Sequence, residues 1–221
     1  MAIKAALTIC FLLPAFAVAA PYDFDDPNSY LSSAEAMSSW AETLTKHAQQ
    51  RDDLLACRSE RGCKGRLKSF NRMMARSQAL SDEEKIELAN FYINRNNYDD
   101  DRIERIYDEN GKKTGVIRSQ WMTLYDFLTK GGDCEDYATS KYFMLRELGI
   151  AAEDMRVVVV FSRELRGYHA VLAVQRPDGA TWLLDSDNVV RKKRHIGYRY
   201  IFAINENSIW DHREDFAGSA R

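Results

Sequence analysis

The chain has 221 residues, of which 45% are apolar and 29% are charged, and its formal net charge is −2. This composition excludes a disordered chain, which would be poorer in apolar residues, and a collagen-like chain, which would have glycine at every third position. The charge balance argues against nucleic acid as the main partner. The length suits one domain, or one domain with a small extra lobe.

The first segment, residues 1–19, is typical of a secretory signal peptide. Lys4 gives it a positive start, an apolar run follows, and residues 17–19 are Ala-Val-Ala, the small-x-small form that signal peptidase cleaves. A membrane anchor is the alternative, but the run is shorter than the roughly 20 apolar residues of a spanning helix. We therefore expect cleavage of this segment, no transmembrane segment in the mature chain, and a periplasmic location, where disulfides form.

Three cysteines remain in the predicted mature chain, and an odd number leaves one thiol unpaired. Cys57 and Cys63 lie six positions apart with Gly62 between them, which predicts a local disulfide. The alternative is a zinc site that includes His47, but two cysteines and one distant histidine are too few ligands. Cys134 is then the free thiol, which is either buried and inert or present for its chemistry.

The first half of the chain is predicted to be helical. Apolar residues recur at spacings of three and four over 29–56, which predicts one helix, and a second is predicted over 67–79. Ser81, with Glu84 three positions on, forms a capping box that begins a third helix. Residues 109–112, Glu-Asn-Gly-Lys, predict a turn.

The second half changes from a helical to an alternating pattern. A helix is predicted over 134–148, ended by Gly149, and its main stripe contains Tyr137, Lys141, Tyr142, Leu145 and Leu148. The predicted strands cover 155–161, 168–175, 181–185 and 198–204, with an Arg-Pro-Asp-Gly turn at 176–179. Helices first and strands later indicate an α+β fold with an antiparallel sheet.

Cys134 lies at the first turn of its predicted helix, in the sequence Gly-Gly-Asp-Cys-Glu-Asp. A helix N-terminus favours an anion and can lower the pKa of a thiol. Asp133, Glu135 and Asp136 oppose this effect unless a cation neutralises them. One interpretation is therefore a hard cation bound by oxygen ligands, with calcium as the first choice. The other is that these acids simply cap the helix.

A thiolate nucleophile needs a base, and the base needs an orienting partner. His169 lies on a predicted buried strand and, on its own, would be interpreted as a core histidine. If that strand and the next one pair around the turn, Asp185 faces His169 within about two rungs. The carboxylate can then bind one ring nitrogen while the other takes the thiol proton. Asp187 is the alternative orienting residue, because a slip of one residue would turn Asp185 away.

Three motifs together resemble a known family. Gly-Gly-Asp-Cys-Glu-Asp-Tyr-Ala at 131–138, His-Ala-Val-Leu at 169–172 and Leu-Leu-Asp at 183–185 are similar to the bacterial transglutaminase-like cysteine peptidases. The resemblance implies a papain-like, transglutaminase-like core, which we place at 90–221. Residues 20–89, where the pattern is helical, are predicted to form an N-terminal helical lobe, in one compact domain overall.

The resemblance also implies functional roles. It implies that Cys134 is the nucleophile, His169 the general base and Asp185 its orienting residue. It implies a calcium (Ca2+) site made of three neighbouring carboxylates: Asp133, Glu135 and Asp136. Members of this type cut the N-terminal region of large surface adhesins at an Ala-Ala bond in biofilm dispersal, and an inner-membrane cyclic di-GMP receptor inhibits them. We expect the same substrate class and partner here.

The chain departs from the family pattern at Leu124, where proline is usual, and at Ser186, where asparagine is usual. Two other functions stay open at this point: acyl transfer to an amine, and a binding module whose thiol is idle. The basic residues 191–194 are interpreted as a solvated loop, with contact to the membrane receptor or to lipid headgroups as the alternative.

Overall fold

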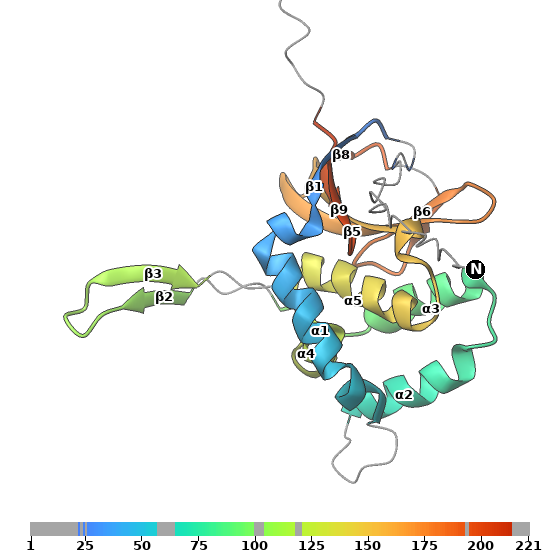
Figure 1. Ribbon diagram of the computed structural model, residues 1–221, viewed down its shortest axis with the longest axis horizontal. Coiled ribbons are helices and arrows are strands. Elements are labelled where there is room, and N and C mark those ends of the chain that lie inside the picture. Colours follow the sequence, from blue (N-terminus) through green and yellow to red (C-terminus); the bar gives the residue numbers. More distant parts are fainter. Residues whose placement is uncertain are drawn as a thin grey trace, which may run out of the picture.

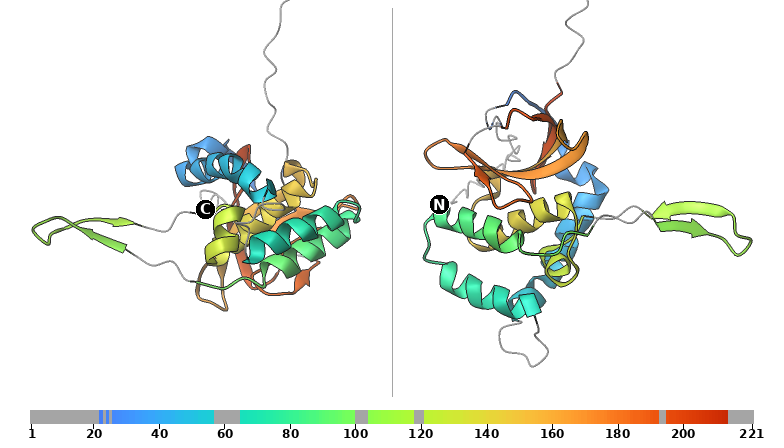
Figure 2. Two further views of the ribbon diagram at one scale, coloured as in Figure 1. Left: turned by 90° about the horizontal axis from the view of Figure 1, so that it is seen from below. Right: turned by 180° about the vertical axis from the view of Figure 1, so that it is seen from behind.

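The computed structural model describes residues 22, 24, 26–56, 65–99, 104–117, 121–192 and 195–213. In this part of the chain, helices cover one face of a seven-stranded antiparallel sheet (Figures 1 and 2). The predicted α+β class is thereby confirmed. None of the described helices is long and apolar enough to cross a membrane.

The described helices are α1 (Ser38–Ala56), α2 (Gly65–Ser77), α3 (Asp82–Ile93), α4 (Leu124–Lys130) and α5 (Cys134–Glu147), with short 3-10 turns η1 (Ala34–Ala36) and η2 (Ala152–Asp154). Local sequence sets their ends. The predicted capping box begins α3, because the Ser81 hydroxyl accepts from the Glu84 N–H and the Glu84 carboxylate accepts from the Ser81 N–H at 2.8 Å. Gly149 has a φ of +92° just after α5, a conformation that stops the helix.

The strands of the large sheet are β1 (Ser29–Ser33), β4 (Met155–Ser162), β5 (Gly167–Gln175), β6 (Thr181–Leu184), β7 (Val190–Arg191), β8 (Tyr198–Ile204) and β9 (Ser208–Asp211). Their order is β1-β9-β8-β4-β5-β6-β7. The four strands predicted from the sequence are confirmed as β4, β5, β6 and β8. Strand β4 lies in the middle, and its run of valines is largely buried because both faces of the sheet are covered.

A separate hairpin is made by β2 (Glu104–Tyr107) and β3 (Lys113–Ile117). Its strands pair around the predicted turn, where Gly111 has a φ of +75°. The hairpin projects away from the layers of helix and sheet (Figure 1). The sequence predicts the turn but not the two strands beside it.

The predicted helix over 29–56 is wrong in its first part. Residues 29–33 form the edge strand β1, with Ser29 opposite Asp211 of β9, and the helix starts at Ser38. Leu31, the first residue of the helical pattern, is 54% exposed and belongs to no apolar stripe. The partner strand, which comes from the other end of the chain, decides the conformation of this segment.

Side chains of β5 alternate between two apolar clusters on opposite faces of the sheet. Ala170, Leu172 and Val174 belong to the larger cluster, which lies between the sheet and the helices. Val171 and Ala173 belong to a smaller cluster on the other face. Helix α5 packs against β5 on the helical side and is buried along most of its length. This arrangement fixes the start of α5 close to the start of β5.

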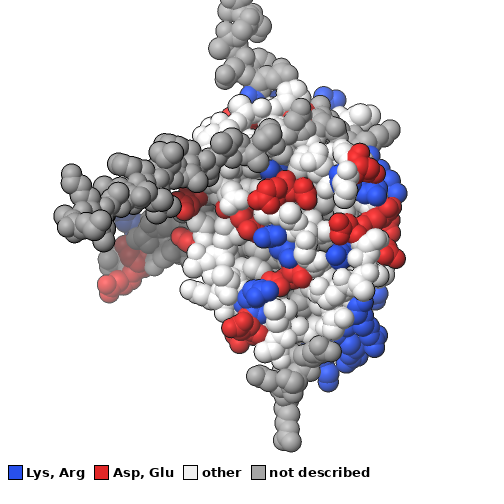
Figure 3. Space-filling model, turned by 45° about the vertical axis from the view of Figure 1, so that its right-hand side comes forward, with Lys and Arg blue, Asp and Glu red and all other residues white. Residues whose placement is uncertain are grey.

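Several sequence predictions lie outside the described residues, namely the signal peptide over 1–19 and the disulfide between Cys57 and Cys63. The boundary predicted between 89 and 90 falls inside α3, and β1 joins the sheet of the core. The division into a helical lobe and a core stays a prediction. On the face shown in Figure 3, acidic and basic side chains are interspersed, in keeping with the small net charge of −2.

Candidate active site

Two glycines allow Cys134 to begin α5. Gly131 has a φ of +87°, and a Cβ atom there would lie 2.6 Å from the backbone oxygen of Asn97. A side chain at Gly132 would collide with the carboxylate of Asp136. Asp136 completes a capping box with Asp133, because the Asp136 carboxylate accepts a hydrogen bond from the Asp133 backbone N–H at 3.3 Å. The local sequence therefore places the thiol at a helix start, as predicted.

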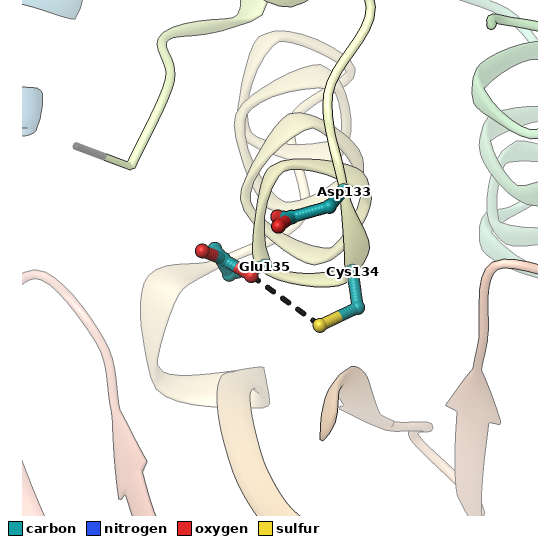
Figure 4. A group of neighbouring side chains, drawn as sticks. All are labelled: Asp133, Cys134 and Glu135. Carbon is teal, nitrogen blue, oxygen red and sulfur yellow. Dashed lines mark hydrogen bonds between the residues drawn. The ribbon is translucent and has the colours of Figure 1, made fainter. Parts of the chain in front are cut away.

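The Cys134 thiol is half-buried and has two polar neighbours. Its Sγ donates to Oε2 of Glu135 at 3.3 Å (Figure 4), and the backbone N–H of Ala170 on β5 points at the sulfur. Burial, followed by the charge and hydrogen bond of Glu135, raises the pKa of the thiol, and the Ala170 N–H opposes this only in part. The protein's own groups therefore favour the protonated thiol.

Asp133 and Glu135 form a small acidic cluster with the thiol. One ligand atom from each of Asp133, Cys134 and Glu135 lies within 4.8 Å of the others, and Figure 4 shows both carboxylates beside the start of α5. Carboxylate oxygens suit a hard cation such as calcium, so these residues fit the predicted metal. Burial raises the pKa of the thiol most, and the charges of Glu135 and Asp133 raise it further.

Asp136 lies apart from this cluster. It is almost completely buried, and its two carboxylate oxygens accept backbone N–H groups, one from Met122 at 2.7 Å and one from Asp133 at 3.3 Å. This arrangement matches the capping role that the sequence analysis gave as the alternative. A role of Asp136 as a calcium ligand stays a prediction.

His169 and Asp185 lie in direct contact. Nε2 of His169 and Oδ1 of Asp185 are 2.6 Å apart, and both side chains are buried. The register pairs Leu172 with Leu184, so a continued pairing would place His169 opposite residue 187. Asp185 follows β6 directly and lies two rungs from that position, on the same face of the sheet as His169, so that its side chain reaches the imidazole. The expected geometry is therefore present. Because the bond uses Nε2, Nδ1 is the nitrogen left for proton exchange.

The imidazole and the thiol approach the start of β5 from different sides. The side chains of His169 and Ala170 point to opposite faces of the sheet. The His169 ring lies 6.0 Å from that of Tyr198, which packs against the smaller apolar cluster. The sulfur meets the N–H of the next residue, Ala170, on the helical side. The structure thus brings the predicted base and its orienting residue together. The sulfur of the predicted nucleophile contacts the backbone N–H of the residue that follows the base, Ala170.

Further polar groups hold Asp185 in place. The Tyr198 hydroxyl donates to Oδ2, and the buried Lys141 ammonium and the Asn94 amide donate to the backbone oxygen at 2.6 and 3.0 Å. Burial raises the pKa of Asp185, but the hydrogen bond and charge of His169, together with Tyr198, outweigh it and place the pKa well below its ordinary value. The carboxylate is therefore held ionised.

Tyr198 and Lys141 are site residues that are not predicted from the sequence. Lys141 had one signal, since it is a lysine within an otherwise apolar helical stripe. Burial lowers its pKa to about 7, against the opposing charges of Asp185 and Asp187. The alternative orienting residue, Asp187, is not used as such: its carboxylate pairs with Arg191 at 2.8 Å and is half-exposed.

Two other predictions concern residues away from this site. His47, the candidate zinc ligand, is buried and stacked on Phe143 with ring centroids 3.9 Å apart, while its suggested cysteine partners are not among the described residues. In the basic run, Arg191 pairs with Asp187, and the Lys192 ammonium lies 4.6 Å from the centre of the Trp182 ring. The described half of that run therefore has partners within the chain.

Comparisons with known proteins concern the family of the chain and its fold. A family model described as bacterial transglutaminase-like cysteine proteinase BTLCP matches residues 58–214. Among solved structures, calcium-bound LapG of Legionella pneumophila is similar, with a TM-score of 0.57 and 22% identity over 76% of this chain and 87% of that chain. EGTA-treated LapG matches with the same TM-score and identity over 73% and 84% of the two chains. No curated protein matches the sequence.

Proposed function

Because the chain belongs to the bacterial transglutaminase-like cysteine proteinases, we propose that it is a calcium-dependent cysteine endopeptidase of the periplasm. The observation that carries this proposal is the buried His169–Asp185 pair, with a bond of 2.6 Å, beside the backbone N–H that meets the Cys134 thiol. A nucleophile, a base and an orienting carboxylate are the groups that this chemistry requires.

In the proposed reaction, the thiol exchanges its hydrogen bond to Glu135 for one to Nδ1 of His169, which takes the proton. The thiolate attacks a peptide carbonyl carbon, an S–C bond forms, and the amine leaves with the proton from His169. Water then attacks the acyl carbon and gives a proton to His169, the C–S bond breaks, and His169 returns the proton to the Cys134 sulfur. Asp185 keeps the imidazole oriented and stabilises its charged form. The Cys134 N–H, at the first helical position, is a candidate oxyanion donor.

Asp133 and Glu135 are the residues that would hold the calcium ion, with Asp136 as the third predicted ligand. A bound divalent cation supplies positive charge that offsets the carboxylates beside the thiol. The similar LapG structures include a calcium-bound and an EGTA-treated form, which supports this choice of metal.

Chelation should therefore inhibit the enzyme. We expect excess EGTA to lower cleavage by at least about tenfold, since each raised pKa unit of a thiol removes about tenfold of its thiolate, and added calcium should restore it. Glu135→Gln should weaken the calcium dependence, whereas Glu164→Gln, on an exposed turn, is the control. Full cleavage in excess chelator would remove the metal from the proposal.

The proposed substrate is the N-terminal region of a large surface adhesin, cut at an Ala-Ala bond to release the adhesin in biofilm dispersal. The proposed inhibitor is an inner-membrane receptor for cyclic di-GMP. Both follow from the resemblance to the adhesin-cleaving members of the family, which covers the three motifs around Cys134, His169 and Asp185.

Cys134→Ala is the direct test of the nucleophile. We expect it to abolish cleavage of an adhesin N-terminal region while the circular dichroism spectrum stays that of the wild type. The products separate the possible reactions: new peptide termini indicate hydrolysis, and an amine-tagged product indicates acyl transfer. A variant that cuts at the wild-type rate would refute this role of Cys134. A wild-type thiol that reacts with iodoacetamide no faster than free cysteine would favour a binding module.

A further inference from the structure

Beside the start of α5, one end of the sheet is not covered by any of the described helices and is exposed at Tyr168 and Arg199. Three neighbouring residues lie there side by side on adjacent strands: Tyr168 on β5, Phe161 on β4 and Arg199 on β8. Tyr168 is 72% exposed, Phe161 is half-buried, and Arg199 is exposed. We call these three residues the aromatic strip.

The aromatic strip faces the same side of the sheet as the Cys134 thiol. Along β5, Tyr168 has the same orientation as Ala170, which belongs to the cluster under the helices and whose N–H meets the sulfur. Ala170 is paired with Val159 of β4, and Phe161 lies two residues further along. The strip is therefore two rungs beyond the Val159–Ala170 pair, and it is the next position along the sheet that faces the same side.

Contacts within the strip make one continuous surface. The rings of Phe161 and Tyr168 are perpendicular with centroids 6.0 Å apart, and the Arg199 guanidinium lies 5.5 Å from the centre of the Phe161 ring. An edge-to-face pair of this kind is stable while leaving ring faces available for another apolar group. The surface is thus apolar in its middle and carries one cation at its end.

The position of the strip indicates what covers it. A polypeptide whose carbonyl lies at the Cys134 sulfur must extend over the neighbouring surface. Two residues along a strand span about 7 Å, which is also the reach of two residues in an extended peptide. A substrate residue about two positions from the scissile bond therefore comes to Tyr168.

We propose that the aromatic strip is a specificity surface of the enzyme, which binds an apolar side chain of the polypeptide substrate about two residues from the scissile bond. The inference rests on the proposed peptidase function and adds a substrate preference to it. Tyr168 and Phe161 supply the apolar contact, and Arg199 can donate to a backbone carbonyl of the same substrate segment.

The test compares two reagents with the same reactive group on the full-length protein with calcium present. They are benzyloxycarbonyl-Phe-Ala chloromethyl ketone and benzyloxycarbonyl-Gly-Ala chloromethyl ketone, and the measurement is the rate of Cys134 alkylation by mass spectrometry. In the wild type, we expect the Phe reagent to react at least about tenfold faster, the effect of partly burying one aromatic side chain. The ratio of the two rates cancels any change in the reactivity of the thiol itself.

Tyr168→Ser should lower this ratio to about twofold or less, since the main apolar contact is lost. Tyr30→Ser is the matched control, because Tyr30 is 52% exposed on β1, at the far edge of the sheet, and should keep the wild-type ratio. A wild-type ratio near one, or an unchanged ratio in Tyr168→Ser, would overturn the inference while leaving the peptidase proposal intact. Alkylation of wild-type Cys134 no faster than that of free cysteine, by either reagent, would overturn both.

Discussion

The described part of the chain contains two buried histidine–aspartate pairs near the same end of the sheet, one with its histidine on β5 and one with its histidine just after β9. His169 and Asp185 are joined by a bond of 2.6 Å, and His212 and Asp26 by one of 2.7 Å. The two pairs have the same chemistry and nearly the same length. They differ in what surrounds the imidazole.

His169 lies next to the residue whose N–H meets a thiol, whereas His212 lies among aromatic rings. The ring centroids of Tyr22 and Tyr200 are each 5.2 Å from that of His212, and both contacts are nearly perpendicular. The His212–Asp26 pair joins the chain after β9 to the segment before β1. A buried pair of this type can therefore serve either catalysis or structure, and the neighbour of the second ring nitrogen decides which.

Replacing each histidine in turn gives the largest expected difference between the two pairs. His169→Gln should lower kcat/KM for peptide cleavage by about 10²–10⁴, the usual contribution of a general base. His212→Gln should leave the rate within about twofold, and lower the free energy of unfolding by about 1–3 kcal/mol, because it disturbs a buried hydrogen-bonded group. The measurements are steady-state cleavage and urea unfolding of both variants.

A large loss of activity in His212→Gln, at a temperature where that variant is folded, would break the comparison. So would cleavage by His169→Gln at the wild-type rate.

Two tyrosines of β8, one beside each pair, allow the same comparison with a smaller expected change in kcat. Tyr198 donates to Oδ2 of Asp185, and Tyr200, two residues on, packs against His212. Tyr198→Phe removes one hydrogen bond to a charged group, and such a bond contributes about 1.5–3 kcal/mol. We expect part of this free energy to be lost from transition-state stabilisation, which lowers kcat about three- to tenfold. Tyr200→Phe should keep the wild-type kcat. Equal kcat values for the two variants would show that Tyr198 does not position Asp185.

A third histidine, His47, has no aspartate partner among the described residues, and its expected effect is on stability alone. Burial lowers the pKa of His47 from 6.5 to about 4. Because the unfolded chain then binds more protons than the folded one between these two values, stability is full above pH 6.5 and falls as the pH drops towards 4, by up to about 3 kcal/mol.

His47→Phe should remove this part of the acid destabilisation, because a phenyl ring keeps the stacking on Phe143 and binds no proton. The measurement is the free energy of unfolding of both proteins at pH 4.5 and pH 7.5. If the difference between them were the same at the two pH values, His47 would not be the titrating group.

Local patterns predicted much of the catalytic geometry. The glycines and the capping residues around Cys134 are contiguous in sequence, so the start of α5 could be predicted from them. The bond from His169 to Asp185 could be predicted from strand alternation around a single turn, because sequence neighbours in a hairpin are also neighbours in space.

Contacts between distant segments were not predictable in this way. Tyr198 reaches Asp185 only because β8 pairs with β4, and no local pattern specifies that pairing. The same holds for β1, a mostly exposed strand whose conformation depends on β9. The acidic run around Asp136 predicts a possible ligand, whereas in the folded chain both of its carboxylate oxygens accept backbone N–H groups.

The pairing of β1 with β9 has a consequence for biosynthesis. The first strand of the sheet to leave the ribosome has its partner in the last strand to be made, and β9 also covers the outer edge of β8. Until β9 has been synthesised, β8 keeps an open edge that can pair with another nascent chain. The sheet is therefore completed only when the segment through Asp211 is present, and a chain that ends before β9 leaves this edge of β8 open.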